Sequence, residues 1–359
     1  MIDNADQHPS RRAVLGAGGL TVAGLIATDL VTAPPAAAGP NDQARPILRP
    51  FPRTGQQVPA VGLGTFMTFD SLPGDDTRRI EEVTRRFWRG GGRVIDTSPL
   101  YGRAEVNLGR FLRGVADRAF LMNKIWSTGD FLWDDSHAEA SLRRSMERLT
   151  RDRPLDIVAC HNLVNVDVIV PLLHAWKAEG RIRHLSVTHH DPAYFDLLVR
   201  WIETGDLDAI QVHYSVHTRI AEERVLGAAA DRGTAVFVNM PLEKGRLPAI
   251  TEGKPLPGFA AELGITSWPE LYLKWVIAHP AVTAVLPATS NPDHLTENLR
   301  ALRGPLPDPE QRRRLVAELS ELDGFAELAG MPWYPGRNYR GLVSRGQQRI
   351  RDRSPWWPS

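Results

Sequence analysis

Short runs rich in β-branched and other apolar residues recur along this chain and alternate with segments of helical periodicity. This alternation constrains the fold more than any other feature, because a repeated strand–helix unit favours a parallel sheet covered by helices. The pattern predicts strands at eight places, 61–64, 94–96, 120–124, 155–161, 184–188, 209–213, 235–239 and 284–287. A chain of 359 residues is long enough for all of these units to share one core.

The helical segments between these runs carry end signals that support the alternation. Asp191 and Asn291 each precede a proline, which is typical of an N-cap followed by the first helical position. Ser136 and Glu139 have the spacing of a capping box, which predicts Ser136 as the N-cap of the helix that follows.

Eight strand–helix units fit a closed (β/α)8 barrel better than an open sheet, which usually has fewer strands. The alternative is an open doubly wound sheet, which would place a glycine-rich phosphate-binding turn between its first strand and first helix. The segment 62–65 has two glycines but lacks the third, and no helical pattern begins there. We therefore predict an α/β fold, a (β/α)8 TIM barrel over 54–325, with an N-terminal hairpin around Thr54 and Gly55 and a C-terminal extension at 326–359.

The N-terminal residues have the pattern of an export signal, and a linker at 39–53 is predicted to follow it. Arg11 and Arg12 precede an uncharged stretch of small residues, and an alanine-rich segment suited to cleavage ends at Ala38. The uncharged stretch is shorter than the roughly 20 apolar residues that span a bilayer. Paired arginines are typical of a twin-arginine signal, whose translocon carries folded proteins. We therefore predict that 1–38 is removed and that the protein is exported to the periplasm or the cell exterior.

An ordinary Sec signal and an uncleaved N-terminal arm are the alternatives for this segment. The formal net charge is +1, so no global field attracts nucleic acid or an anionic membrane. We expect no nucleic-acid partner, no stable membrane insertion after cleavage, and the twin-arginine translocon as a partner during export. The single cysteine, Cys160, excludes an intramolecular disulfide and a cysteine-built zinc site.

Polar and ionisable residues gather at the carboxyl ends of the predicted strands. In a barrel these ends meet at one rim, where active sites lie. Each residue alone has a structural explanation, such as a helix cap, a solvated lysine or a hydrogen-bonded core histidine. Their joint placement favours a functional site, because buried charges without partners are costly. These strand-end residues are Thr65, Asp96, Lys124, His161, Thr188, His189, Gln211, His213, Asn239, Thr289 and Ser290.

Four residues at or near this rim have the chemistry that protonating a carbonyl oxygen requires. A free phenol such as that of Tyr101 has a pKa near ~10, and a lysine ammonium within a few ångströms lowers that pKa. Asp96 would keep Lys124 charged and oriented, and His161 can donate a hydrogen bond to a substrate carbonyl. None of these groups supplies a hydride, so a reduction also needs a cofactor.

The order of these motifs resembles the aldo-keto reductase family over roughly residues 54–325. The third and fourth strands end at Lys124 and His161, as the family requires. The segments that carry the resemblance are Val61-Gly62-Leu63-Gly64-Thr65, Ile95-Asp96-Thr97-Ser98 with Tyr101-Gly102, Glu105 with Leu108-Gly109, Asp156 to Asn162, Gly180 to Thr188, and Gln211 with Tyr214-Ser215.

The resemblance implies an NAD(P)H-dependent enzyme that reduces an aldehyde or ketone to an alcohol, with a small carbonyl compound as substrate and no metal. It assigns the general acid to Tyr101 and the tuning of that acid to Lys124 and Asp96. It assigns the orientation of the carbonyl to His161. The residues that it places along the cofactor are Thr65, Thr188, His189, Gln211, Asn239, Pro241, Leu242, Gly245, Leu247, Pro287, Thr289, Ser290, His294, Glu297 and Asn298.

Three departures from the family pattern bear on the cofactor. Thr188 and His189 stand where Ser and Asn are usual, and Asn239 stands where an aromatic residue commonly stacks on the nicotinamide. Ala288 and His294 replace the basic residues that often hold the 2′-phosphate. The family habit still favours NADPH, with NADH as the alternative. Because an unperturbed histidine has a pKa near ~6.5, we expect a modest preference for NADPH that grows as the pH falls toward about 6.

Two other functions are open from the sequence. A nucleotide-binding regulatory or interaction subunit, like the aldo-keto-reductase-type β subunits of ion channels, would share the fold but turn over little. A metal-dependent barrel hydrolase could use the strand-end histidines, but its usual His-x-His pair is absent at the end of the first strand. The tail at 326–359 is rich in arginine and tryptophan. It is interpreted either as a strap across the barrel or as a functional segment that lines the substrate mouth or docks a partner.

Overall fold

The computed structural model describes residues 44–353 except 132 and 150–152. The predicted export signal at 1–38, the first part of the predicted linker and residues 354–359 lie outside the described part of the chain.

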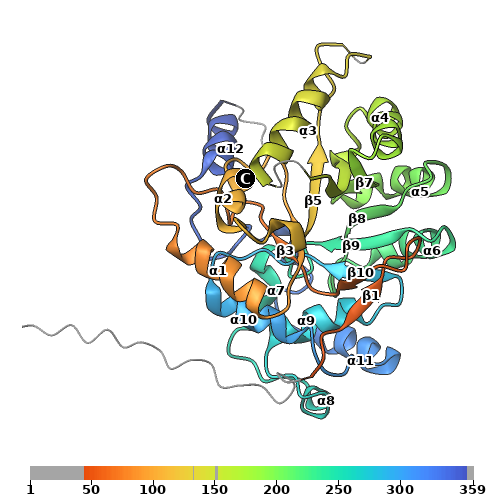
Figure 1. The fold of residues 1–359 in the computed structure, drawn as a ribbon. Coiled ribbons are helices and arrows are strands. Elements are labelled where there is room, and N and C mark those ends of the chain that lie inside the picture. The colour runs from red at the N-terminus through yellow and green to blue at the C-terminus, as the bar shows by residue number, and fades with distance from the viewer. Residues whose placement is uncertain (1–43, 132, 150–152, 354–359) are drawn as a thin grey trace, which may run out of the picture. The chain divides into compact units, whose positions relative to one another are not determined.

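Eight parallel strands form one sheet in which each strand pairs with the next along the chain (Figure 1). Isolated bridges join Val61 to Val285 and Gly64 to Ala288, so the first and last strands also meet and the sheet closes into a barrel. The predicted TIM barrel is confirmed, and each predicted strand overlaps an observed one. The strands are β3 (Leu63–Gly64), β4 (Val94–Asp96), β5 (Phe120–Ile125), β6 (Leu155–Cys160), β7 (Ile182–His189), β8 (Ala209–His213), β9 (Ala235–Asn239) and β10 (Val282–Val285).

Two glycines allow the barrel to close. A Cβ atom on Gly62 would lie 2.7 Å from a methyl carbon of Leu286, and one on Gly64 would lie 2.8 Å from the Leu286 carbonyl oxygen. The Gly62 amide instead donates to the Val285 carbonyl at 2.8 Å. These glycines therefore allow the first strand to pack closely against the last one. They have this structural role and do not form a phosphate-binding turn.

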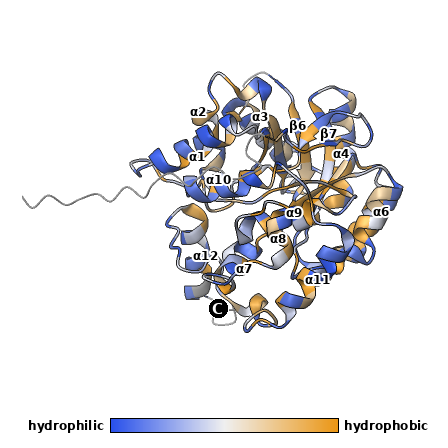
Figure 2. Ribbon diagram, turned by 90° about the horizontal axis from the view of Figure 1, so that it is seen from below, coloured by the Kyte–Doolittle hydropathy of each residue, from blue (hydrophilic) through white to orange (hydrophobic). Residues whose placement is uncertain are grey.

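Helices alternate with the strands and cover the outside of the sheet (Figure 1). Strands β6 and β7 are mostly hydrophobic, whereas the surrounding helices combine hydrophilic and hydrophobic faces (Figure 2). No helix among the described residues is long and apolar enough to cross a membrane. The described α-helices are α1 (Arg78–Arg89), α2 (Ala104–Phe111), α3 (Ser136–Leu149), α4 (Val166–Ala178), α5 (Phe195–Thr204), α6 (Val225–Asp231), α7 (Arg246–Ile250), α8 (Gly258–Glu262), α9 (Trp268–Ile277), α10 (Pro292–Arg300), α11 (Pro309–Ser320) and α12 (Leu342–Arg353).

Two of the three predicted helix starts are confirmed. The Asp191 carboxylate accepts from the Ala193 amide at 3.0 Å, and the Asn291 side chain accepts from the Asp293 amide at 3.1 Å. The capping box at Ser136 is wrong, because Ser136 is already the first residue of α3. The carboxylate of Glu139 is used elsewhere, since it accepts from the Trp176 indole and the Arg181 guanidinium.

The predicted N-terminal hairpin is present and closes one end of the barrel. Its strands β1 (Leu48–Pro50) and β2 (Gln57–Pro59) are antiparallel. Strand β1 lies inside the segment 39–53 that was predicted as a linker. Between them, the buried ring of Phe51 stacks on His184 of β7 at 4.3 Å between ring centroids. The Arg49 guanidinium donates to the Ile277 carbonyl at 2.8 Å, which fastens the hairpin to the end of α9.

Candidate active site

A buried ion pair lies where β4 and β5 end. The Lys124 ammonium donates to Asp96 Oδ1 at 2.6 Å and to the Thr97 carbonyl oxygen at 2.8 Å. Lys124 is 2% exposed and Asp96 is 5% exposed, so water contributes little to their solvation. The Thr65 hydroxyl donates to the Asp96 carbonyl at 2.9 Å and joins the end of β3 to this pair. These bonds fix the position and direction of the lysine ammonium.

Tyr101 lies beside this pair, on the turn between β4 and α2. The Lys124 ammonium is 5.0 Å from the centre of the phenol ring, and the His161 ring is 5.9 Å away in an edge-to-face arrangement. The structure therefore brings together the four side chains that the sequence predicts for carbonyl chemistry.

Ser98, which the sequence analysis missed, orients His161. The Ser98 hydroxyl oxygen accepts from the Leu100 amide and lies 3.2 Å from His161 Nδ1. The Ser98 hydroxyl can donate its proton to Nδ1, and the neutral imidazole then carries its own proton on Nε2. Burial and the Lys124 charge hold the pKa of His161 well below its ordinary value, so the ring is neutral at neutral pH.

The electrostatics of Tyr101 differ from the expectation that Lys124 lowers its pKa. Burial raises the pKa of Tyr101 well above its ordinary value, and the charge of Asp96 and the neighbouring Tyr334 raise it further. Burial also lowers the pKa of Lys124, although Asp96 opposes this shift. The phenol therefore keeps its proton at neutral pH, as a general acid must.

Asp96, Tyr101 and His161 line a cavity of about 1230 Å³, whereas Lys124 does not line it. All but two of the predicted cofactor residues line it. His189 does not, because its Nδ1 accepts from the Asp191 amide at 3.1 Å and its ring stacks on Tyr194, whereas His190 lines the cavity instead. Leu247 is fully buried in the hydrophobic core.

The inner wall of the cavity fits a group with its own donors and acceptors. Thr188 of β7, Gln211 of β8 and Asn239 of β9 lie there. The Asn239 Oδ1 atom is buried and has no hydrogen-bond partner among the described residues. An unpaired buried acceptor is costly, so this wall suits a carboxamide such as that of nicotinamide.

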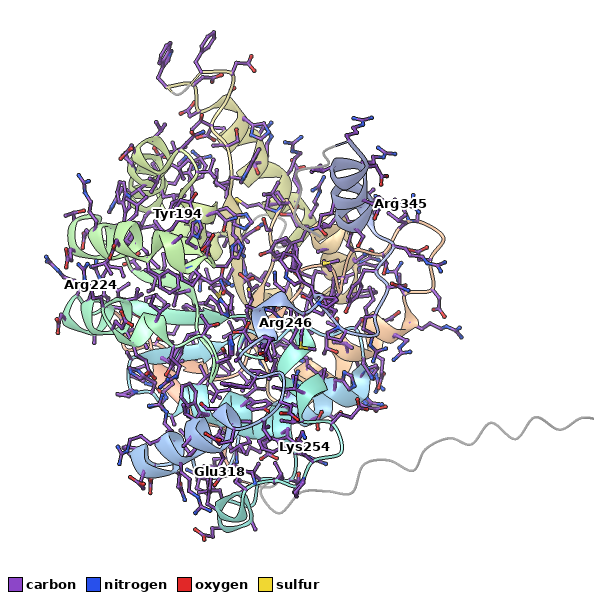
Figure 3. The ribbon with its side chains drawn as sticks, turned by 180° about the vertical axis from the view of Figure 1, so that it is seen from behind. Tyr194, Arg224, Arg246, Lys254, Glu318 and Arg345 are labelled. Carbon is purple, nitrogen blue, oxygen red and sulfur yellow. The ribbon has the colours of Figure 1, made fainter. Side chains whose placement is uncertain are left out.

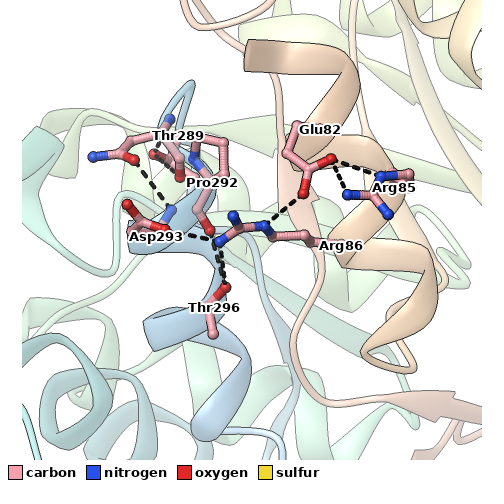
Figure 4. Close-up of polar contacts among 8 residues, drawn as sticks. Glu82, Arg85, Arg86, Thr289, Pro292, Asp293 and Thr296 are labelled. Atoms are coloured by element: carbon pink, nitrogen blue, oxygen red, sulfur yellow. Dashed lines mark hydrogen bonds and ion pairs between the residues drawn. The ribbon is translucent and has the colours of Figure 1, made fainter. Parts of the chain in front are cut away.

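The far end of the cavity is formed by α10, which carries His294, Glu297 and Asn298. Figure 4 shows how this helix is held against α1. Arg86 of α1 bonds to Asp293 at 2.8 Å and to the Thr296 hydroxyl at 3.2 Å. These contacts fix the three cavity-lining side chains of α10 relative to the barrel.

The predicted growth of the NADPH preference at low pH is not supported by the surroundings of His294. Burial lowers the pKa of His294, and although Glu297 opposes this shift, the charges of Arg337 and Arg79 add to it. The imidazole therefore gains its charge at a lower pH than an unperturbed histidine does.

A buried carboxylate outside the predicted site organises the loop after β9. Glu243 accepts hydrogen bonds from Ser215 at 2.6 Å and Arg246 at 2.8 Å, and its Oε1 lies 2.6 Å from His213 Nε2. Burial would raise the pKa of Glu243, but the bonds from His213 and Ser215 outweigh it and lower that pKa to about 2. Arg246 lies near the middle of the molecule in Figure 3. Local sequence gave no signal for this cluster, because its members come from different strand ends.

The C-terminal extension forms one wall of the cavity, which favours the second of its two interpretations. Trp333, Tyr334, Arg337 and Tyr339 line the cavity together with residues of α12. The Tyr334 amide donates to the Lys244 carbonyl at 2.8 Å, so the extension is held close to the loop after β9.

The strand-end histidines do not converge as a metal site would require. His161 and His190 line the cavity, His213 contacts Glu243, and His189 is turned toward Tyr194. Within the described ranges no group of three or more His, Cys, Asp or Glu side chains is placed to hold a metal ion.

Comparison with known proteins places this geometry in a family. A sequence model of the Aldo/keto reductase family matches residues 60–315. An NADH-specific methylglyoxal reductase from Escherichia coli is 25% identical over 324 residues, which cover 76% of this chain and 98% of that protein. The crystal structure of an aldo/keto reductase from Klebsiella pneumoniae in complex with NADP and acetate has a TM-score of 0.61 at 26% identity, and the match covers 80% of this chain and 96% of that one. An aldo-keto reductase from Bacillus halodurans in its holo form has the same fold, with a TM-score of 0.62 at 21% identity over 81% of this chain and 99% of that one.

The closed barrel and the polar rim around one large cavity define a TIM-barrel oxidoreductase. The family match spans most of the barrel, and the chain belongs to the aldo/keto reductase family. It is accordingly an NAD(P)H-dependent oxidoreductase.

Proposed function

We propose that this protein reduces an aldehyde or ketone to an alcohol, with NADPH as its cofactor and NADH as the alternative. The observation that carries the proposal is the buried Lys124–Asp96 pair beside Tyr101 and a neutral His161, at the inner end of one large cavity. The relatives support both nucleotides, since one is named as NADH-specific and another was crystallised with NADP.

The chemistry divides between the cofactor and the side chains. A bound reduced nicotinamide supplies the hydride that the carbonyl carbon accepts. Tyr101 donates its proton to the carbonyl oxygen, and His161 Nε2 donates a hydrogen bond that orients and polarises that oxygen. Lys124 stabilises the negative charge left on the phenol, and Asp96 holds the ammonium in place.

We assign residues of the cavity wall to each part of the nucleotide. Thr188, Gln211 and Asn239 would hold the nicotinamide carboxamide, for which Asn239 Oδ1 has a free acceptor site. The loop from Pro241 to Gly245 would lie along the pyrophosphate. The predicted residues on the β10–α10 loop and on α10 would hold the adenosine end of the nucleotide. They are Pro287, Thr289, Ser290, His294, Glu297 and Asn298.

The direct test is nucleotide oxidation by the purified protein. We expect carbonyl-dependent loss of the near-ultraviolet absorbance of NADPH or NADH, measured over a panel of aldehydes and ketones. The panel includes methylglyoxal, because a relative is named for it. Tight nucleotide binding without turnover of any carbonyl would instead support the nucleotide-binding regulatory subunit.

We also propose that residues 1–38 direct export by the twin-arginine route, on the strength of the Arg11-Arg12 pair and the uncharged stretch after it. Replacing both arginines with lysine should leave the protein in the cytoplasm, because the receptor reads the arginine pair and not its charge. Cell fractionation followed by immunoblotting measures this. Unchanged export of the double-lysine variant would contradict the route and favour a Sec signal.

A further inference from the structure

We propose that the C-terminal segment 333–343 is a clasp over the adenosine end of the cofactor and that Arg337 supplies the cation for the 2′-phosphate of NADPH. This inference rests on the proposed function, because it concerns the same cavity. It assigns a role to the extension that the strand-end residues do not predict, since Arg337 lies far from them in the sequence.

The clasp is fastened at its first end to the loop after β9. The Tyr334 amide donates to the Lys244 carbonyl at 2.8 Å, and the Lys244 ammonium lies 2.8 Å from the centre of the Trp333 ring. Burial lowers the pKa of Lys244 to about 7, so the side chain is charged below that pH and then adds a cation–π contact to the backbone bond.

The clasp is fastened at its other end to the catalytic turn. The buried Asp70 carboxylate accepts from the Val343 amide at 2.7 Å, in the first turn of α12, and from the Arg103 amide at 2.9 Å. A Cβ atom on Gly102 or Gly341 would collide with Asp70, so both glycines are needed for this close approach. The same carboxylate therefore holds the clasp and the segment that carries Tyr101.

Between these ends the clasp passes over the adenosine end of the cavity. Tyr339 lies near Ser290 on the loop before α10, because Ser290 opposes the rise that burial causes in the pKa of Tyr339. Arg337 lines the cavity with His294 and Glu297. Burial is the main cause of the lowered pKa of His294, and the nearby charge of Arg337 lowers it further.

The Arg337 guanidinium has no ion-pair partner among the described carboxylates. The backbone amide of Arg337 donates a hydrogen bond to the Tyr334 carbonyl at 2.9 Å. Ala288 carries no charge, and the lowered pKa of His294 disfavours its charged form at this end of the cavity. Arg79 also influences His294 but does not line the cavity. Lys244 and Lys254 line the cavity too, but of the three cavity-lining cations only Arg337 acts on the pKa of His294. Its planar guanidinium suits a phosphate at this end.

The test compares Arg337→Gln with Arg340→Gln, a matched change at an exposed clasp arginine that does not line the cavity. Tryptophan fluorescence titrations with NADPH, NADH, 2′,5′-ADP and 5′-ADP give dissociation constants without turnover. Arg337→Gln should weaken NADPH and 2′,5′-ADP about 10- to 100-fold and leave NADH and 5′-ADP within about twofold. Arg340→Gln should change none of them by more than about twofold.

Each other outcome has a definite meaning. An equal loss of affinity for NADPH and NADH would place Arg337 on the pyrophosphate and overturn its assignment to the 2′-phosphate. Unchanged affinity for all four ligands would overturn the clasp as a nucleotide contact. Failure of the unmodified protein to bind either dinucleotide would overturn the proposed function, and this proposal with it.

Discussion

Replacing Tyr101 with phenylalanine should lower the rate of carbonyl reduction by about 10²- to 10⁴-fold, the usual contribution of a general acid. The substitution removes one hydroxyl and keeps the ring, so its edge-to-face contact with His161 remains. Nucleotide affinity should stay within about twofold, because the phenol is assigned to the carbonyl and not to the cofactor. Steady-state kinetics and fluorescence titration measure the two quantities separately.

Tyr334→Phe is the matched control, because this phenol also lines the cavity and lies close enough to raise the pKa of Tyr101. It should keep most of the activity. Burial raises the pKa of Tyr101, so ionisation of this phenol should cause no loss of activity below about pH 10 in the unmodified protein. Full activity of Tyr101→Phe on every carbonyl that the parent reduces would identify a different acid.

Replacing Glu243 with glutamine should destabilise the protein by about 3–5 kcal/mol, the usual cost of leaving a buried charge without its partner. The change removes the negative charge that pairs with the buried Arg246 guanidinium. Because the pKa of Glu243 falls from 4.5 to about 2 on folding, its stabilisation is complete above pH 4.5 and is lost as the pH falls through about 2. Denaturant unfolding at several pH values measures both the loss and its pH dependence.

Glu318→Gln provides the comparison, because Glu318 forms an exposed pair with Arg314 one helical turn away. Its loss should cost less than about 1 kcal/mol. Equal destabilisation by the two substitutions would show that the Glu243 cluster contributes no more than a surface pair.

The strands and the four central side chains could be predicted because their signals are local. In a strand–helix repeat the carboxyl ends of all the strands meet at one rim. The sequence alone therefore predicts that Asp96, Lys124 and His161 lie close together. Tyr101 followed because it lies a short turn beyond β4.

What the sequence did not predict depends on side-chain direction or on distant partners. His189 and His190 are neighbours, and only the packing of His189 against Tyr194 decides which of them faces the cavity. Glu139 matched a capping box by its spacing, but Arg181 and Trp176 of neighbouring elements bind its carboxylate. The pKa of Tyr101 likewise depends on its burial and on the charges around it, which only the assembled site determines.

The fastening of the hairpin to α9 has a consequence for how the protein is made. Arg49 and Ile277 are separated by 228 residues, so one of the first contacts in chain order needs almost the last part of the barrel to be synthesised. Closing so long a loop costs chain entropy, and contacts between residues far apart in the sequence slow folding. This contact therefore forms late. A nascent chain therefore leaves Phe51 without the rings of His184 and Phe237 until β7 and β9 have been synthesised, although Phe120 of β5 is made earlier.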